Sequence, residues 1–388
     1  MHNFTAFNIC LCAHSSFHLP FPQKSAGLIM VRRIHTHTLI ESASGMSGKP
    51  SLKELGYRFN QKGELRTIND NAPFVFTNQA DYERIGDAMT MELYGMLESV
   101  CGLRKIEVPV KVEDKNGTTV DFAGFVYASP EFQEKSTVLL IIHGSGAVRP
   151  GQWSRRLILN ESLEVGSQIP YIRRALVNDW GVIVCSTNTD EEFRDYPHQH
   201  LCSVYEQLLK DSTIQRFFVV AHSRGGPDIA HSLPHFKNEN RFEVVCLTDS
   251  VGLDDNCLSE KQTNGGTVFI NWKADSKLQS AAIADQDILE PYSRVHQIYA
   301  GTTEHERSSH TAFDSVFHVL EQWKGPDSLP KLLVEAAGLT SVSCLSNKIF
   351  YWLNGGLPRP IVAVITQDLG LESWRPNAVR VEEDYGCE

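Results

Sequence analysis

The sequence predicts an α/β fold built on a mostly parallel, doubly wound sheet. Short apolar runs alternate with segments whose apolar residues recur every three or four positions, as in strands joined by crossover helices. The strands are predicted at 138–142, 181–185, 217–221, 243–248, 267–272 and 295–299. The helices that connect and follow them are predicted near 167–178, 200–210, 226–236 and 311–323.

Two further elements precede these strands. Apolar residues at steps of three and four within 81–100, with Gly102 just past the end, predict an amphipathic helix. Strict alternation in 106–112, the turn dipeptide Asn116-Gly117 and an apolar return over 120–127 predict a β-hairpin. An antiparallel N-terminal hairpin is therefore expected to open the sheet.

A turn around Ser223 carries the strongest functional signal. The apolar run 217–221 is followed closely by Ser223, and Gly225 and Gly226 come next. Small residues beside the serine permit a sharp strand-to-helix turn, which projects the hydroxyl from the end of the sheet. Ala221 replaces the first glycine of the G-x-S-x-G elbow typical of α/β hydrolases. Ser223 is therefore the predicted nucleophile.

A second turn predicts an oxyanion hole. The sequence H-G-S-G at 143–146 follows strand 138–142, where α/β hydrolases carry a loop that supplies one oxyanion N–H. The second N–H would come from Arg224, the residue after the serine. Gly144, Ser145 and Arg224 are the predicted oxyanion-hole residues. Ordinary strand-end turns are the alternative interpretation, but the order of the two turns favours the paired one.

Chain order selects the other catalytic candidates. In α/β hydrolases the acid follows the nucleophile and the histidine comes last. His305 lies just past the last predicted strand and is the expected base, with His310 as the main alternative. Asp275 ends the second strand after the nucleophile strand and is the expected acid, while Asp249, at the end of the first, is the alternative. A Ser223–His305–Asp275 triad is thus predicted.

Composition argues against several other functions. The chain has 388 residues and a net charge of −11, which argues against a dedicated nucleic-acid surface. The nine cysteines contain no C-x-x-C pair, and their scatter favours reduced thiols within the cell. His198 and His200 could form a metal pair, but no third ligand is evident from the sequence. No metal or other cofactor is therefore predicted.

No membrane partner is expected either, because no apolar run approaches about 18 residues. Along the chain, 1–49 is predicted to be a disordered or misannotated leader, with Met46 as a candidate start. Residues 50–325 form the predicted domain. Residues 326–388 form a tail without an assigned role, although 332–353 is expected to hold a helix.

Several motifs form a specific combination. They are I-H-G-S-G-A-V-R-P-G-Q-W-S-R-R-L-I (142–158), Q-I-P-Y-I-R-R-A (168–175), F-F-V-V-A-H-S-R-G-G (217–226), L-T-D-S-V (247–251) and A-G-T-T-E-H-E (300–306). This combination resembles the Arb-type (Argonaute-binding protein) domain family, in particular its animal cotranscriptional regulators, over roughly residues 50–325. The resemblance implies an α/β-hydrolase-like fold and a nuclear role in small-RNA-guided chromatin or splicing control.

The chain departs from that family at three places. The family usually has Tyr after the serine, where this chain has Arg224, a cation that could hold an anionic ligand or block the site. Animal members carry a lysine-rich insertion where 187–215 is short and not basic, so a nuclear signal of that kind is missing. The acid region also departs, so the resemblance does not support Asp275.

Two functions follow. The resemblance implies an Argonaute-associated regulator of small-RNA-guided gene silencing, heterochromatin formation or cotranscriptional alternative splicing. Its partner would be an Argonaute-family protein, with small RNA bound indirectly through that partner, in the nucleus, the cytoplasm or both. The alternative, from the residues themselves, is an active serine hydrolase of the esterase, thioesterase or amidase type. The sequence indicates no oligomeric state.

Overall fold

The computed structural model describes residues 48–236, 239–253, 258, 266–280 and 295–341. The chain divides into two units, 1–48 and 49–388, and every described helix and strand belongs to the second unit. Nearly all of the predicted leader, and the predicted tail beyond residue 341, lie outside the described residues.

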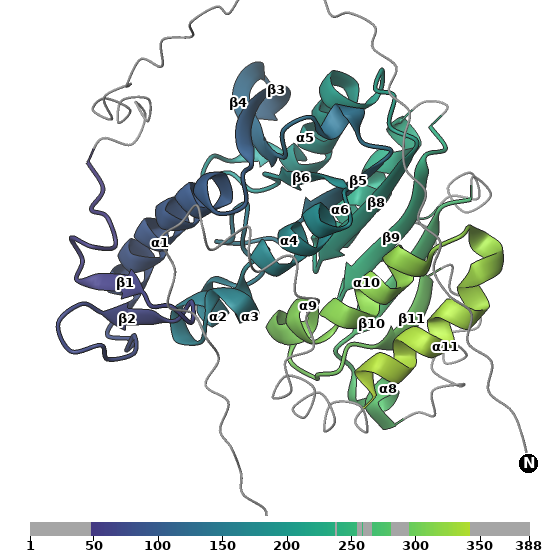
Figure 1. Ribbon diagram of the computed structural model, residues 1–388. Coiled ribbons are helices and arrows are strands. Elements are labelled where there is room, and N and C mark those ends of the chain that lie inside the picture. The colour runs from purple at the N-terminus through teal and green to yellow at the C-terminus, as the bar shows by residue number, and fades with distance from the viewer. Residues whose placement is uncertain (1–47, 237–238, 254–257, 259–265, 281–294, 342–388) are drawn as a thin grey trace, which may run out of the picture. The chain divides into compact units, whose positions relative to one another are not determined.

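A nine-stranded mixed sheet forms the centre of the second unit (Figure 1). Its strands are β3 (Arg104–Asp114), β4 (Thr119–Ala128), β5 (Thr137–Ile142), β6 (Gly181–Cys185), β7 (Phe193–Arg194), β8 (Arg216–His222), β9 (Phe242–Thr248), β10 (Val268–Lys273) and β11 (Val295–Tyr299). They are ordered β11-β10-β9-β8-β5-β6-β4-β3-β7. The six strands β5, β6 and β8 to β11 pair in parallel, and the hairpin β3–β4 continues the sheet in antiparallel fashion. The predicted α/β fold is confirmed.

Helices lie before, between and after these strands. They are α1 (Gln79–Ser99), α2 (Arg155–Asn160), α3 (Leu163–Gly166), α4 (Ile169–Val177), α5 (Tyr196–Val204), α6 (Gly225–Ser232), α8 (Ser276–Ser280), α9 (Ser308–Thr311), α10 (Phe313–Gln322) and α11 (Leu329–Thr340). A short hairpin of β1 (Tyr57–Phe59) and β2 (Leu65–Thr67) precedes α1. In the part of the chain that the structure describes, no helix is long and apolar enough to cross a membrane.

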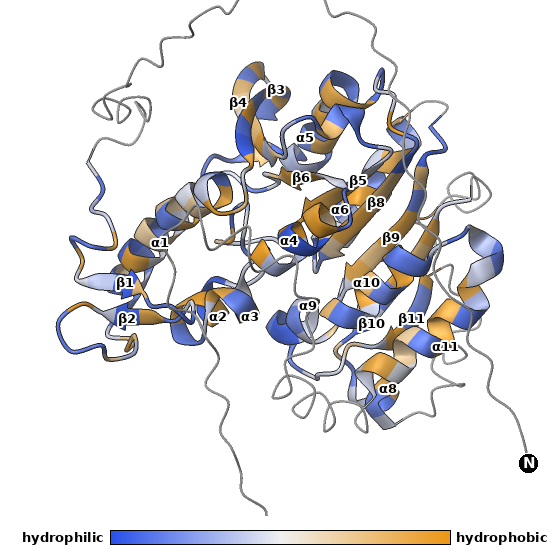
Figure 2. Ribbon diagram, viewed as in Figure 1, coloured by the Kyte–Doolittle hydropathy of each residue, from blue (hydrophilic) through white to orange (hydrophobic). Residues whose placement is uncertain are grey.

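Both faces of the sheet are covered. In β5, Leu139 and Ile141 belong to a core shared with α1, α4, α10 and α11, while Val138 and Leu140 belong to a second core shared with α5 and α6. This alternation follows from the two-residue period of a strand. Figure 2 shows the central strands as almost uniformly hydrophobic. Because both faces are buried, the strand ends are the part of the sheet that a ligand can reach.

Helix α11 lies beyond residue 325, where the predicted domain ends. Its apolar side chains Leu332, Leu333 and Ala336 are buried in the same core as α10. The described fold therefore continues through α11, which corresponds to the first part of the helix expected within 332–353.

Candidate active site

Ser223 sits on a sharp turn between β8 and α6. Its φ is 53°, in the left-handed region that residues other than glycine rarely adopt. The Ser223 N–H donates to Thr248 O at 3.2 Å, and the Ser223 carbonyl accepts from Gly226 N–H at 3.2 Å and from Ser250 Oγ at 2.8 Å. The turn is thus tied to the end of β9 on one side and to its own helix on the other, as the predicted elbow requires.

The two glycines after the serine are explained by their neighbours. A Cβ atom at Gly225 would lie 2.8 Å from His143 O, and one at Gly226 would lie 1.9 Å from Ser250 Oγ. Helix α6 can therefore begin this close to β5 and β9 only with glycine at both positions. The spacing between serine and glycines that drew attention in the sequence reflects this close packing.

His305 is placed beside the serine. It begins a short 3₁₀ turn, η6 (His305–Arg307), in the segment after β11, and its Nε2 lies 3.0 Å from Ser223 Oγ. Ser308 Oγ donates to the His305 carbonyl at 2.8 Å, which fixes the backbone of this turn. His310, the alternative base, is directed to the backbone of Glu164, and burial lowers its pKa.

The carboxylate that faces His305 belongs to Asp249. Its Oδ2 lies 2.6 Å from His305 Nδ1, and its Oδ1 accepts from Ala274 N–H at 3.0 Å. Asp249 follows β9 directly and has a φ of 47°, and its own N–H donates to Trp272 O at 2.7 Å. This second left-handed residue turns the carboxylate across the end of β10 toward the imidazole.

The expectation that Asp275 orients the imidazole needs correction. Asp275 Oδ1 accepts from Lys277 N–H at 2.8 Å, so this carboxylate caps the start of α8. Strand β9 lies directly beside β8 in the sheet, whereas β10 is one strand further away. The carboxylate that faces His305 therefore comes from the end of the nearer strand, at Asp249.

The environment of Asp249 favours its charged form. Burial raises the pKa of this carboxyl, but the hydrogen bonds from His305 and Ala274, together with the nearby Lys273 cation, outweigh burial and hold the pKa below its usual value. An ionised Asp249 accepts a hydrogen bond from the Nδ1–H of His305. The Nε2 lone pair of His305 is then directed at the hydroxyl of Ser223, the tautomer that a general base requires.

The 143–146 turn lies against the serine. A Cβ atom at Gly144 would be 3.1 Å from Ser223 Cβ. The Gly144 carbonyl accepts from Asn188 Nδ2 at 2.8 Å and from the ring of His143 at 2.8 Å. Because the C=O and N–H of a trans peptide point in opposite directions, the N–H of Ser145 is directed away from Asn188.

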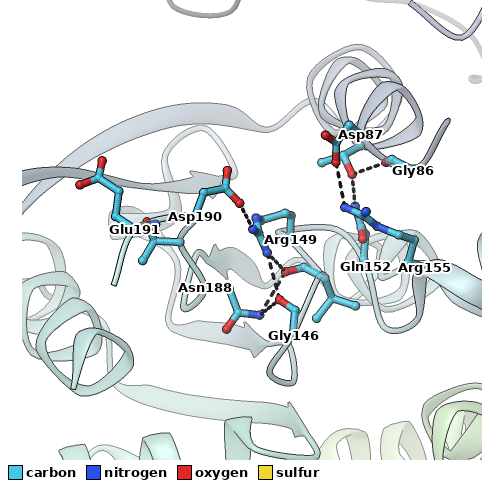
Figure 3. Close-up of polar contacts among 12 residues, drawn as sticks. Gly86, Asp87, Gly146, Arg149, Gln152, Arg155, Asn188, Asp190 and Glu191 are labelled. Atoms are coloured by element: carbon cyan, nitrogen blue, oxygen red, sulfur yellow. Dashed lines mark hydrogen bonds and ion pairs between the residues drawn. The ribbon is translucent and has the colours of Figure 1, made fainter. Parts of the chain in front are cut away.

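Two side chains hold the far side of this turn. Asn188 and Arg149 both donate to the carbonyl of Gly146, and Arg149 is itself paired with Asp190 (Figure 3). Arg224 directly precedes α6, and the first backbone N–H groups of a helix have no partner within it. The predicted oxyanion residues Gly144, Ser145 and Arg224 thus lie in the turn against Ser223 and in the residue that follows it.

The side chain of Arg224 lies along its own helix. Its Nε donates to Asp228 Oδ1 at 3.1 Å, four residues further on. Burial raises the pKa of Asp228 to about 6, although the Arg224 cation opposes this. Since the guanidinium is bound to Asp228, it does not cover Ser223.

Among the described residues, the group with metal-ligand spacing lies elsewhere, at His198, His231 and His235.

The site can now be set beside known proteins. The Arb2 domain model matches residues 49–190. A FAM172 family protein homolog of Caenorhabditis elegans is 38% identical over 299 residues, which cover 74% of this chain and 92% of that protein. The chain belongs to the Arb2 domain family. The human cotranscriptional regulator ARB2A is 28% identical over 339 residues, covering 69% of this chain and 79% of that protein.

Arb2 membership confirms the family resemblance of the sequence motifs, and the vertebrate relatives are named as cotranscriptional regulators. A structure of the histone deacetylase Clr3 aligns with a TM-score of 0.39 and 20% identity, over 65% of this chain and 41% of that chain. An alignment at this level carries no argument about function. The matched segment 49–190 includes the turn at 143–146 but none of Ser223, Asp249 and His305.

Proposed function

We propose that this Arb2 protein is a serine hydrolase that acts on an ester, thioester or amide. Ser223 is the nucleophile, His305 the general base and Asp249 the carboxylate that orients it. The observation that carries the proposal is a continuous hydrogen-bond chain, 3.0 Å from Ser223 Oγ to His305 Nε2 and 2.6 Å from His305 Nδ1 to Asp249 Oδ2. It lies at the carboxyl edge of the parallel sheet, where α/β folds bind ligands.

The geometry implies a two-step reaction. His305 Nε2 takes the Ser223 proton while Oγ attacks the substrate carbonyl, and Asp249 stabilises the resulting imidazolium without being protonated. The developing oxyanion would accept hydrogen bonds from the backbone N–H of Arg224 and from the Gly144–Ser145 turn. His305 then gives its proton to the leaving group, and a water molecule, deprotonated by the same imidazole, releases the acyl group from Ser223.

Backbone strain supports this reading. Ser223 and Asp249 have φ values of 53° and 47°. Such conformations cost about 1–3 kcal/mol each, and they concentrate at functional sites whose surroundings enforce them. Here both strained residues contribute a side chain to the same hydrogen-bond chain. A fold that needed only a turn at these positions would be more stable with glycine.

Fluorophosphonate labelling of the purified chain tests the proposal. We expect covalent labelling of the wild type, and its loss in Ser223→Ala and in His305→Ala. The matched control is His310→Ala, which removes the other candidate imidazole and should keep labelling. Labelling that persists in Ser223→Ala would refute the assignment, and a folded wild type that resists labelling would leave the domain as a scaffold.

We further propose that the cellular role is regulatory: association with an Argonaute-family protein in small-RNA-guided silencing, heterochromatin formation or cotranscriptional alternative splicing, in the nucleus, the cytoplasm or both. The names of the relatives support regulation. Four of the five arginines that could have gathered into a phosphate-binding patch (Arg149, Arg155, Arg156, Arg173 and Arg174) are instead paired with carboxylates. These pairs are Arg149–Asp190, Arg155–Asp87, Arg156–Glu306 and Arg174–Glu321. Two of them appear in Figure 3.

With those cations neutralised and a net charge of −11, small RNA is expected to be reached through the protein partner. Argonaute should co-purify with the protein from cells after RNase treatment. Naked small RNA should bind only weakly, and less as salt rises. Loss of the association on RNase treatment, or tight binding of naked RNA at physiological salt, would contradict this. Repeating the co-purification with Ser223→Ala separates partner binding from hydrolysis.

A further inference from the structure

Three histidines come together where α5 packs against α6. His198 lies in α5, His231 in α6, and His235 in the 3₁₀ turn η3 (Leu233–His235) that continues α6. One ligating atom from each lies within 4.8 Å of the other two. The rings of His231 and His235 are each centred 4.5 Å from that of His198. The four-residue spacing of His231 and His235 puts both rings on the same side of their helix, facing His198.

A buried serine determines which nitrogen of His198 keeps a lone pair. Ser232 donates its only hydroxyl proton to Asp228 O at 2.7 Å, so it accepts from His198 Nδ1, 3.0 Å away. His198 therefore carries its proton on Nδ1, and its Nε2 keeps a lone pair, with the Cys202 thiol 3.7 Å away. Metal-binding imidazoles are commonly held in this way, through a hydrogen bond from the ring nitrogen that does not bind the metal.

The surroundings of the cluster suit a cation. Asp195 Oδ2 lies 3.7 Å from His231 Nε2 and supplies negative charge. A surface pocket of about 250 Å³ opens beside the cluster, lined by Asp195, His198, Arg224, Pro227, Asp228 and His231.

We propose that His198, His231 and His235 bind a divalent transition-metal ion, with zinc as the best fit. Neutral imidazoles suit zinc, and in a tetrahedral site with Zn–N distances near 2.0–2.1 Å the nitrogens are about 3.4 Å apart. The atoms already lie within 4.8 Å of one another, and His231 and His235 are exposed, so side-chain rotation alone can close the cluster. Three protein ligands leave the fourth position to water or to Asp195.

A bound ion would fasten α5 to α6. Helix α6 begins next to Ser223 and ends beside His231, so the ion would hold the far end of the helix that carries the nucleophile at its start. Metal binding to the folded chain would therefore raise its unfolding temperature. This site makes no use of Ser223, so the two assignments can be tested separately.

The test is a Zn²⁺ titration of the purified, tag-free full chain against a chromophoric chelator. We expect one equivalent to bind at this site. The affinity should fall at least about tenfold in His231→Ala and in His235→Ala, and by about tenfold in Ser232→Ala, which removes only the supporting hydrogen bond. The matched control is His318→Ala: His318 pairs with Glu335 at 3.0 Å and should not affect binding.

Cysteines are the competing explanation, so the titration is repeated with Co²⁺. Imidazole ligation gives weak visible bands, whereas thiolate ligation adds strong near-ultraviolet absorption. Visible bands that vanish in the His231→Ala/His235→Ala double variant would support the site. The proposal would be overturned if the wild type bound metal no more tightly than the double variant. It would also be overturned if the only Co²⁺ signal were thiolate absorption and the double variant kept all of it. Unchanged binding in Ser223→Ala keeps this outcome independent of hydrolysis.

Discussion

The two ends of helix α6 handle histidine in opposite ways. At its start, His222 and His143 are fully buried beside Ser223, and burial lowers the pKa of each to about 4. At its end, His231 and His235 are exposed. Because they are buried, the imidazoles of His143 and His222 are fixed, neutral hydrogen-bond donors. His222 Nδ1, for example, donates to Thr248 O at 2.8 Å. The open end keeps its imidazoles free to reorient.

The difference separates two kinds of site. The Ser223 end is already assembled, with the partners of the nucleophile held by hydrogen bonds before any substrate arrives, which is what lowers a reaction barrier. The His235 end is adjustable and would be completed by its ligand. Changes at the first end should therefore have large effects on chemistry and stability, and changes at the second should be small until metal is added.

The largest expected effect tests the assembled end through its acid. Asp249→Asn should lower the rate of fluorophosphonate labelling by about 10³-fold or more, because the amide cannot hold His305 in the required tautomer. Asp275→Asn is the matched control and should stay within about twofold, since Asp275 only caps α8. Rates measured under pseudo-first-order conditions decide between them; a larger loss in Asp275→Asn would reverse the assignment.

The next largest effect is expected from acid, which should lower stability through the buried imidazoles. Unfolded imidazoles bind protons below about pH 6.5, whereas those of His143 and His222 resist protonation until about pH 4. The unfolded chain therefore gains protons first, and stability falls as the pH drops from 7 to 5, by about 2 kcal/mol for each imidazole. The pKa of Asp228, about 6, lies above its unfolded value, so protonation of this group increases the free energy of unfolding by about 1 kcal/mol over the same range.

Urea unfolding in EDTA at the two pH values should therefore show a net loss of at least about 2 kcal/mol at pH 5. His143→Asn keeps a donor for the Gly144 carbonyl but cannot be protonated, so it should remove about 2 kcal/mol of the loss. A wild type equally stable at both pH values would mean that these imidazoles are hydrated.

Packing at the start of α6 gives the next effect. Gly226→Ala brings a methyl group to 1.9 Å from Ser250 Oγ and should destabilise the fold by about 2 kcal/mol in urea unfolding. Gly95→Ala is the matched control, because Gly95 is an exposed residue of α1 with no atom within 4 Å of an added Cβ. It should stabilise by about 0.5–1 kcal/mol. Equal effects would show that α6 can move away from β9.

The smallest effect is expected at the open end. Without metal, His235→Ala should change the free energy of unfolding by less than about 0.5 kcal/mol, as for most exposed positions. Zinc at about 100 times its Kd should then stabilise the wild type by about 2.7 kcal/mol and stabilise the His235→Ala variant less. The comparison between the two ends fails if His235→Ala is strongly destabilising in metal-free buffer.

Much of the fold could be predicted because the central strands β5, β6 and β8 are continuous apolar runs; 138–142 became β5 (Thr137–Ile142) almost unchanged. Helices α2 and α3 were missed, although Ser154 and Ser162 accept the capping hydrogen bonds that begin them. Both helices are too short for a helical period to stand out. Serine caps were the signal available, and they are common in loops as well.

Within the site, Ser223 and His305 could be placed because the turn and the chain order each depend on local sequence. The choice between Asp249 and Asp275 depended on a left-handed backbone at Asp249, which side-chain patterns do not reveal. The three-histidine cluster was missed for a similar reason. His200, the residue paired with His198 from the sequence, is buried and accepts from Ser186 N–H, while the real neighbours come from a different helix.

The boundaries of the family match have an evolutionary consequence. The segment 49–190 that the family model matches ends before β8, so it carries the turn beside Ser223 but none of the three residues that would perform the proposed reaction. A descendant could exchange Ser223, Asp249 or His305 and still be recognised as a member. The family model therefore does not report on the proposed chemistry, and assigning chemistry to any relative requires reading those three positions directly.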